Sequence, residues 1–557
     1  MRSFCQLLQL LALGITPALS VPFASRDVEP SPTAALDYGT YQGVTSGSVT
    51  SFLGMNYAQP PVGNLRFAAP QEPEPFTGVA DATTYGAACP QQDIVLPELL
   101  PKNVTITTSG GLVSEDCLNL NVIKPATASA GDNLPVLFWI FGGAFEIGDA
   151  STYDGSLYVE RSIALGQPII FVAPNYRVNA FGFLASQEVL DANATNLGLR
   201  DQRLALQWVN KYISQFGGDP EKVTIWGESA GAYSVAAHLV WNDGDTGGLF
   251  RAGVMESGPP ISLGTVAEGQ QYYDQLVENV GCSGEADTLA CLRAVDYVVL
   301  QAAIALSPSF FSYQSLTLAW EPRIDGQYIL RGGMKYIQQG LYAKVPVIIG
   351  DCYDEGTLFS FANTNITTDE EFLEYVQSNY IPIASDSQIE DLGEAYPSDI
   401  SEGAPYDTGL LWALTPEFKR LASFQGDWLW QAPRRYFLET VSQTQDAWAY
   451  LYKRGSVTVP YLGAAHATDL LEFFTSIDYI APDALIFFTT NLNPNAPADL
   501  ESGLSKLSDI TWDQWGSDAS APPLLTFVDP APEVEITADT FRADAISLLN
   551  ELMLLFP

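Results

Sequence analysis

The chain has 557 residues and a formal charge of −40 at neutral pH, with 47% hydrophobic and 12% aromatic residues. This composition allows a large buried core and excludes a globally disordered chain. Acidic residues are spread along the whole sequence. Such a protein repels phosphate backbones and anionic lipid surfaces, so we expect neither nucleic acid nor an anionic membrane as a partner.

The N-terminal segment has the features of a secretory signal peptide. Arg2 precedes an apolar run, and small residues end this run at Ser20, where a signal peptidase would cleave. A buried helix and a membrane anchor are the alternatives. We predict that residues 1–20 are a signal peptide, that residues 21–557 form a single large domain, and that the protein is secreted. Later segments are too interrupted by polar residues to span a bilayer, so no stable membrane insertion is expected.

Secretion into an oxidising compartment changes what the cysteines imply. Of the six cysteines, Cys5 lies in the predicted signal peptide and five follow it. Close spacing suggests two disulfides, although other pairings stay open. The suggested pairs are Cys89–Cys117 and Cys282–Cys291, which leaves Cys352 over. Three sequons predict glycosylation on surface loops; they are at Asn103, Asn193 and Asn365.

From about residue 135 to residue 260 the sequence alternates between apolar strands and helices. Strands are predicted over 135–141, 168–177, 222–227 and 251–258, and later strands over 345–350 and 448–453. Helices are predicted over 201–216, from its apolar spacing, and directly after residue 228. Apolar strands between helices predict an α/β fold with a mostly parallel sheet covered on both faces. The segment after about residue 265 is predicted to be a partly helical insertion.

A G-x-S-x-G pattern, Gly227-Glu228-Ser229-Ala230-Gly231, lies between a predicted strand and a predicted helix. The pattern alone is weak, but in this context it forms the sharp turn that holds a serine hydroxyl at the top of a sheet. The alternative is an ordinary turn whose serine caps the helix. We predict that Ser229 is a nucleophile.

Only two histidines, His238 and His466, can supply the base that such a serine needs. His238 lies nine residues along the nucleophile helix, which places it about 13 Å from Ser229. A base must lie within roughly 3 Å of the hydroxyl. His466 is in a Gly/Ala loop before an apolar segment, and by elimination we predict that it is the base.

The third member of a serine triad is a buried carboxylate that orients the imidazole. In α/β-hydrolases the chain order is serine, acid, histidine. The segment "VPVIIGDCYDEGTLF", residues 345–359, follows this order and begins as a buried strand. It contains three carboxylates, Asp351, Asp354 and Glu355. The residues themselves do not select one of them.

A glycine loop supplies candidate donors for an oxyanion. Gly142, Gly143 and Ala144, in "IFGGAFEIG", follow a core strand and bring bare backbone close to a substrate. A tight structural turn is the alternative. Beside the nucleophile turn, this loop and the N–H of Ala230 are predicted to form an oxyanion hole. The sequence has no zinc, phosphate-loop or dinucleotide motif, so no metal and no cofactor are expected.

These motifs, in this order, resemble those of the type-B carboxylesterase/lipase family, which includes cholinesterases and secreted fungal lipases. The resemblance covers nearly the whole mature chain, including "SEDCLNLNV", "WIFGGAFEIG", "GDCYDEGT" and "YLGAAHATDLLEFF". It implies an α/β-hydrolase fold with large inserted helical segments, and it supports the two suggested disulfides.

The resemblance also implies roles for particular residues. It selects Glu355 as the triad acid beside Ser229 and His466. The oxyanion donors that it implies are Gly143, Ala144 and Ala230. Residues that support the site without reacting are Gly142, Glu228 and Ser257.

The expected activity is hydrolysis of small-molecule or lipid carboxylic esters through an acyl-enzyme. The loop between the first two paired cysteines covers the site in this family, and here it lacks the aromatic residues that a choline site needs. Its apolar residues suit either a lid or packing onto the core; they are Ile94, Val95, Leu96, Leu99 and Leu100. We favour a carboxylesterase for moderate acyl chains. The alternatives are a lipase or sterol esterase, a feruloyl-type esterase, a peptidase, and a non-catalytic binding protein.

Overall fold

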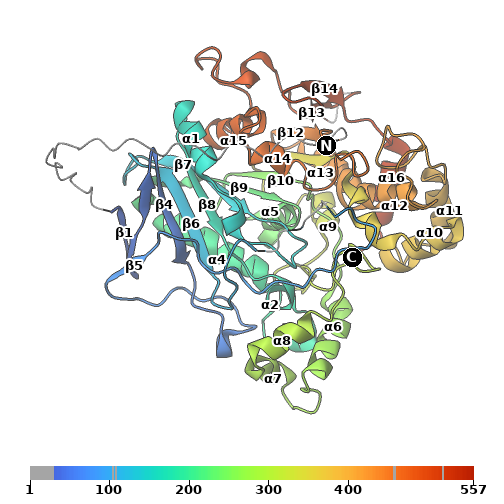
Figure 1. Ribbon diagram of the computed structural model, residues 1–557, viewed down its shortest axis with the longest axis horizontal. Coiled ribbons are helices and arrows are strands. Elements are labelled where there is room, and N and C mark those ends of the chain that lie inside the picture. The colour runs from blue at the N-terminus through green and yellow to red at the C-terminus, as the bar shows by residue number, and fades with distance from the viewer. Residues whose placement is uncertain (1–30, 103–105, 107–108, 456–458, 517–519, 557) are drawn as a thin grey trace, which may run out of the picture. The chain divides into compact units, whose positions relative to one another are not determined.

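The computed structural model describes residues 31–102, 106, 109–455, 459–516 and 520–556. The predicted signal peptide and Asn103 lie outside these residues. Residues 32–557 form one compact unit around an eleven-stranded sheet (Figure 1). The strand order is β14 (Val534–Ala538), β13 (Pro523–Phe527), β12 (Ala447–Tyr452), β11 (Val347–Cys352), β10 (Ala252–Glu256), β9 (Gly218–Glu228), β7 (Leu134–Ile140), β8 (Ile170–Pro174), β6 (Asn119–Pro125), β4 (Val49–Asn56) and β3 (Val44–Ser46).

All six predicted strands lie in the centre of this sheet, where β8, β7, β9, β10, β11, β12 and β13 pair in parallel. The edge strands β3, β4, β6 and β14 are antiparallel and were not predicted. β6 was not predicted because its sequence is not uniformly apolar. Its buried residues include Asn119 and Asn121, whose side chains donate to backbone carbonyls. A separate small sheet contains β1 (Thr33–Leu36), β2 (Gly39–Gln42) and β5 (Val79–Asp81).

Helices cover both faces of the large sheet, as the sequence predicts. The helix expected over 201–216 is α4 (Leu197–Tyr212), continued by a 3₁₀ turn, η3 (Ile213–Phe216). It packs beside α5 (Ala230–Val240), which follows β9 and contacts β7, β9 and β10. On the other face α1 (Ser156–Ala164) contacts β6 and β8, and α15 (Ile480–Asn491) contacts β7 and β9.

Long helical insertions separate the later core strands (Figure 1). Between β10 and β11 lie α6 (Val266–Asn279), α7 (Thr288–Ala294), α8 (Tyr297–Ile304) and α9 (Gly333–Gln338). Between β11 and β12 lie α10 (Asp369–Tyr375), α11 (Asp386–Ala395), α12 (Phe418–Gly426) and α13 (Ala432–Val441). The C-terminal helix is α16 (Ala543–Met553), whose apolar face packs on this second insertion. The remaining helices are α2 (Asn179–Phe183), α3 (Gln187–Asp191) and α14 (Leu470–Phe473).

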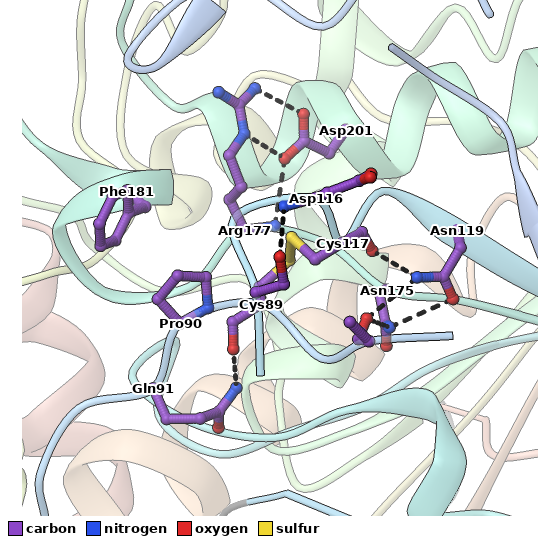
Figure 2. The surroundings of a disulfide bond; sticks show 12 residues. Cys89, Pro90, Gln91, Asp116, Cys117, Asn119, Asn175, Arg177, Phe181 and Asp201 are labelled. Atoms are coloured by element: carbon purple, nitrogen blue, oxygen red, sulfur yellow. Dashed lines mark hydrogen bonds and ion pairs between the residues drawn. A yellow bond between two sulfur atoms is a disulfide. The ribbon is translucent and has the colours of Figure 1, made fainter. Parts of the chain in front are cut away.

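The structure pairs the cysteines as the spacing suggests: Cys89 with Cys117, and Cys282 with Cys291. Cys352 is free and buried. Figure 2 shows that the first disulfide lies beside the buried ion pair between Arg177 and Asp201. Two predicted glycosylation sites, Asn193 and Asn365, are exposed. Among the described residues, no helix is both long and apolar enough to cross a membrane.

Candidate active site

Ser229 lies at the turn between β9 and α5, with a left-handed φ of 53° and a ψ of −125°. The flanking glycines follow from crowding at this turn. A Cβ on Gly227 would lie 2.4 Å from the backbone of Gly231, and a Cβ on Gly231 would lie 2.0 Å from the carbonyl oxygen of Ile140. The G-x-S-x-G pattern is therefore imposed by the close contact of β7, β9 and α5. The Ser229 N–H donates to the carbonyl of Glu256 at 2.8 Å, which fixes the turn to β10.

The structure brings together the three residues proposed for the triad. His466 Nε2 lies 2.8 Å from Ser229 Oγ, and His466 Nδ1 lies 2.5 Å from Glu355 Oε2. The Nδ1–H donates to the carboxylate, so the Nε2 lone pair faces the serine hydroxyl. The chain Ser229–His466–Glu355 is thus set to move a proton from the hydroxyl to the imidazole.

Glu355 is held from its other side by two donors. Its Oε1 accepts from Ser257 Oγ at 2.6 Å and from the N–H of Cys352 at 2.6 Å. The carbonyl of Ser257 in turn accepts from Trp430 Nε1 at 2.8 Å. The rings of Trp430 and Phe359 pack against the imidazole, with ring centroids 4.6 Å and 5.3 Å from that of His466. These contacts leave the carboxylate and the imidazole one orientation each.

Burial sets the charge states in this site. Desolvation lowers the pKa of His466 to about 4, although Asp469 and Asp351 act in the opposite direction. The imidazole is therefore neutral at neutral pH and able to accept a proton. Burial raises the pKa of Glu228, whose carboxyl lies 3.5 Å from His466 Nε2. Burial also raises the pKa of Glu355, while the hydrogen bonds from Ser257 and Cys352 act in the opposite direction.

The other two carboxylates of the acidic segment point elsewhere. Asp351 accepts from Arg434 Nε at 2.8 Å, and both side chains are fully buried. Asp354 accepts from the N–H of Tyr406 at 2.8 Å and from the N–H of Ala464 at 2.9 Å. Of the three candidates that the sequence leaves open, only Glu355 reaches the imidazole.

The glycine loop after β7 lies directly over the serine. A Cβ on Gly142 would lie 2.9 Å from Ser229 Cβ and 2.6 Å from the carbonyl of Glu228, so only glycine fits there. Gly143 and Ala144 have φ values of 116° and 56°. No described residue accepts a hydrogen bond from the N–H of Gly143 or Ala144. The N–H of Ala230, the first residue of α5, has no acceptor within its helix. Free backbone donors thus lie in the two segments that adjoin Ser229, the glycine loop and the start of α5.

The first disulfide supports this loop through two glutamines that follow Cys89, the first of which, Gln91, is shown in Figure 2. Gln91 donates to the carbonyl of Cys89 at 2.7 Å and accepts from the N–H of Gly148 at 2.6 Å. The N–H of Gln92 donates to the carbonyl of Glu146 at 2.9 Å. The segment that carries the free N–H groups is therefore hydrogen-bonded to the residues that directly follow Cys89 in the Cys89–Cys117 loop.

A cavity of about 610 Å³ opens over Ser229 and extends along α5. One wall of the cavity follows α5 at helical spacing; its residues are Tyr233, Ala236, Ala237 and Val240, with Trp241 directly after the helix. Its other walls come from the two helical insertions and from α16, and they are mainly apolar. Helical spacing after the G-x-S-x-G motif was a usable signal for this wall. No comparable signal in the sequence marked Trp430.

The apolar run of the Cys89–Cys117 loop was expected either to form a lid or to pack onto the core, and as a whole it does neither. Leu100 is buried and Ile94 packs against the core, whereas Val95 and Leu99 are 78% and 56% exposed. The described residue of this loop that lines the cavity is Ile106.

His238 also lies outside the site. Its Nε2 lies 3.1 Å from Gln202 Oε1, and burial lowers its pKa to about 3. The contact and the lowered pKa both indicate a packed residue of α5, as the distance along the helix predicts.

Comparison with known proteins agrees with this geometry. The family model described as "Carboxylesterase family" matches residues 30–489. Lipase 5 of Diutina rugosa is 42% identical over 92% of this chain and 93% of its own length. A secreted triacylglycerol lipase of Gibberella zeae is 38% identical over 93% of this chain and 90% of its own. The crystal structure of Aspergillus niger EstA superposes with a TM-score of 0.78 at 30% identity, over 94% and 98% of the two chains. The fold is an α/β-hydrolase fold, and the chain belongs to the carboxylesterase family of carboxylic ester hydrolases.

Proposed function

We propose that this protein is a secreted lipase-type esterase that cleaves esters of long acyl chains at Ser229. One observation carries the proposal: the hydrogen-bonded chain Ser229–His466–Glu355 lies below free backbone N–H groups, at the start of a long apolar cavity. An exposed predicted sequon at Asn193 and another at Asn365, the predicted signal peptide and a relative named as secreted support secretion.

The proposed reaction has two half-reactions, acylation and deacylation, and in each of them His466 acts first as a base and then as an acid. Ser229 Oγ attacks the ester carbonyl as its proton moves to His466 Nε2, and Glu355 stabilises the imidazolium. The oxyanion accepts hydrogen bonds from the N–H groups of Gly143, Ala144 and Ala230. His466 then protonates the leaving alcohol, which leaves an acyl group on Ser229. Water, deprotonated by His466, releases the acid and restores the serine.

The length of the cavity favours long acyl chains over the moderate chains that the sequence favoured. The α5 wall runs from Ala230 to Val240, a distance of about 15 Å along the helix. An apolar wall of this length contributes binding free energy with each methylene that it covers, about 0.8 kcal/mol. The lipase relatives point the same way.

Labelling with a fluorophosphonate tests the proposed chemistry. The wild-type protein should incorporate one label, on Ser229, and lose its hydrolysis of p-nitrophenyl butyrate in parallel. Ser229→Ala is the matched control and should take no label. If the folded wild-type protein takes no label, or if Ser229→Ala keeps wild-type hydrolysis, the proposal fails.

Ala237→Phe tests the proposed acyl path. The added ring occupies the cavity beyond the first carbons of the chain, so two or three methylenes lose their apolar contact, at about 0.8 kcal/mol each. We expect kcat/KM for p-nitrophenyl palmitate to fall about 10- to 100-fold, while that for the butyrate stays near the wild-type value. Ala237→Ser, which adds little volume, should leave both esters unchanged. An equal loss on both esters would show that the acyl chain does not pass Ala237.

A further inference from the structure

We infer that Asp354 is a positioning residue of this site: its carboxylate fixes the loop that carries His466 against the turn that carries Glu355. The inference rests on the proposed function, because it concerns the geometry of the same Ser229–His466–Glu355 chain. Asp354 touches none of the reacting atoms, and it acts through the backbone.

Two hydrogen bonds between Asp354 and Ala464 connect the two segments, and we call this contact the joint. Asp354 Oδ2 accepts from the N–H of Ala464 at 2.9 Å, and the N–H of Asp354 donates to the carbonyl of Ala464 at 2.9 Å. Asp354 Oδ1 accepts from the N–H of Tyr406 at 2.8 Å, which adds a third segment to the joint. Asp354 directly precedes Glu355, and Ala464 lies two residues before His466. The acid and the base are therefore held together through their backbones as well as through their side chains.

The neighbouring residues fit this joint closely. Thr357 Oγ1 donates to the carbonyl of Leu462 at 2.6 Å, a second connection between the same two segments. Gly463 has a φ of 66°, and a Cβ there would lie 2.1 Å from Asp354 Oδ2. Only glycine lets the loop fold around the carboxylate, which is 4% exposed.

The joint needs an ionised carboxylate, because each oxygen accepts from a different backbone N–H. Burial raises the pKa of Asp354 to about 6, while the N–H groups of Tyr406 and Ala464 act in the opposite direction. Asp354 is therefore ionised at pH 8. In Asp354→Asn the amide NH₂ faces the N–H of either Ala464 or Tyr406, so one of these segments must move; where it faces Ala464, that segment is the loop carrying His466. A displacement of about 1 Å in a catalytic group costs up to about 100-fold in rate.

The test compares isosteric variants at pH 8 with p-nitrophenyl butyrate. Asp354→Asn should lower kcat about 10- to 100-fold with KM unchanged. Thr357→Val, which removes the second connection, should lower kcat in the same direction by a smaller factor. Asp325→Asn is the matched control, since buried Asp325 also accepts backbone N–H groups, those of Gln327, Tyr328 and Ile329. It should lower Tm and leave kcat unchanged.

A spectroscopic measurement separates positioning from loss of stability. The low-field ¹H NMR signal of the His466 Nδ1 proton should shift or broaden in Asp354→Asn and stay unchanged in Asp325→Asn. The inference is overturned if Asp354→Asn keeps the wild-type kcat and Nδ1 signal while its Tm falls. Should Asp354→Asn fail to fold, Thr357→Val decides by the same two readouts. Wild-type protein without Ser229-dependent hydrolysis defeats the proposed function and this inference together, whereas an active wild type with an equally active Asp354→Asn defeats only the inference.

Discussion

Glu355→Gln should lower kcat by about 10⁴-fold while the protein stays folded. The amide oxygen still accepts from Ser257 Oγ and the N–H of Cys352, the two donors on Oε1. The NH₂ group then faces His466 Nδ1, where Oε2 lies in the wild type. Nδ1 becomes an acceptor, so the proton moves to Nε2 and points at Ser229 Oγ. A protonated Nε2 cannot accept the proton of the hydroxyl.

The measurement is kcat on p-nitrophenyl butyrate, with Tm and near-ultraviolet circular dichroism to establish the fold. KM should change little, because Glu355 acts in the transition state. A loss of less than about 10-fold, in a folded variant, would be incompatible with Glu355 as the residue that sets the tautomer.

The acidic segment shows where sequence reasoning succeeds and where it stops. The order of nucleophile, acid and base places the acid in residues 351–355, and the family motif selects Glu355. The physical reason lies in contacts that no local pattern records. Asp351 meets Arg434, 83 residues away, and Asp354 meets the N–H of Ala464, 110 residues away. These partners occupy two of the carboxylates, so one remains for His466.

Contacts between residues far apart in sequence also explain why some strands and site residues were not predicted. Central strands such as β7 are apolar throughout and were predicted within a few residues of their observed ends. β6 is equally buried but contains asparagines, which belong there only because their side chains bond to neighbouring backbone. Trp430, which packs on His466, comes from an insertion far from the triad motifs. The wall of the cavity, in contrast, could have been predicted from the sequence, because Tyr233, Ala237 and Val240 follow helical spacing from Ser229.

Asp351→Asn should have the opposite phenotype to Glu355→Gln, although the two residues are close in sequence. Asp351 accepts from Arg434 Nε, and Arg434 also binds Asp539 through two further nitrogens. All three side chains are fully buried. Removing one partner of a buried ion pair costs about 3–5 kcal/mol. Burial raises the pKa of Asp351 to about 8, although Arg434 acts in the opposite direction, so at neutral pH much of this carboxyl is protonated and the loss falls below this range. Since Asp539 still compensates Arg434, we expect the free energy of unfolding to fall by about 1–2 kcal/mol, close to the contribution of a hydrogen bond to a charged group.

Urea denaturation measures this loss, and kcat measured well below the transition should stay near the wild-type value. Asp407→Asn is the surface control: its pair with Lys453, at 3.4 Å, is largely exposed, and breaking it should cost less than about 1 kcal/mol. If Asp351→Asn instead loses kcat as deeply as Glu355→Gln while remaining as stable as Asp407→Asn, the assignment of Asp351 to stability and Glu355 to catalysis is wrong. The acidic segment would then act on His466 as a unit, because only a shared electrostatic role would make catalysis depend on a carboxylate that faces away from the imidazole.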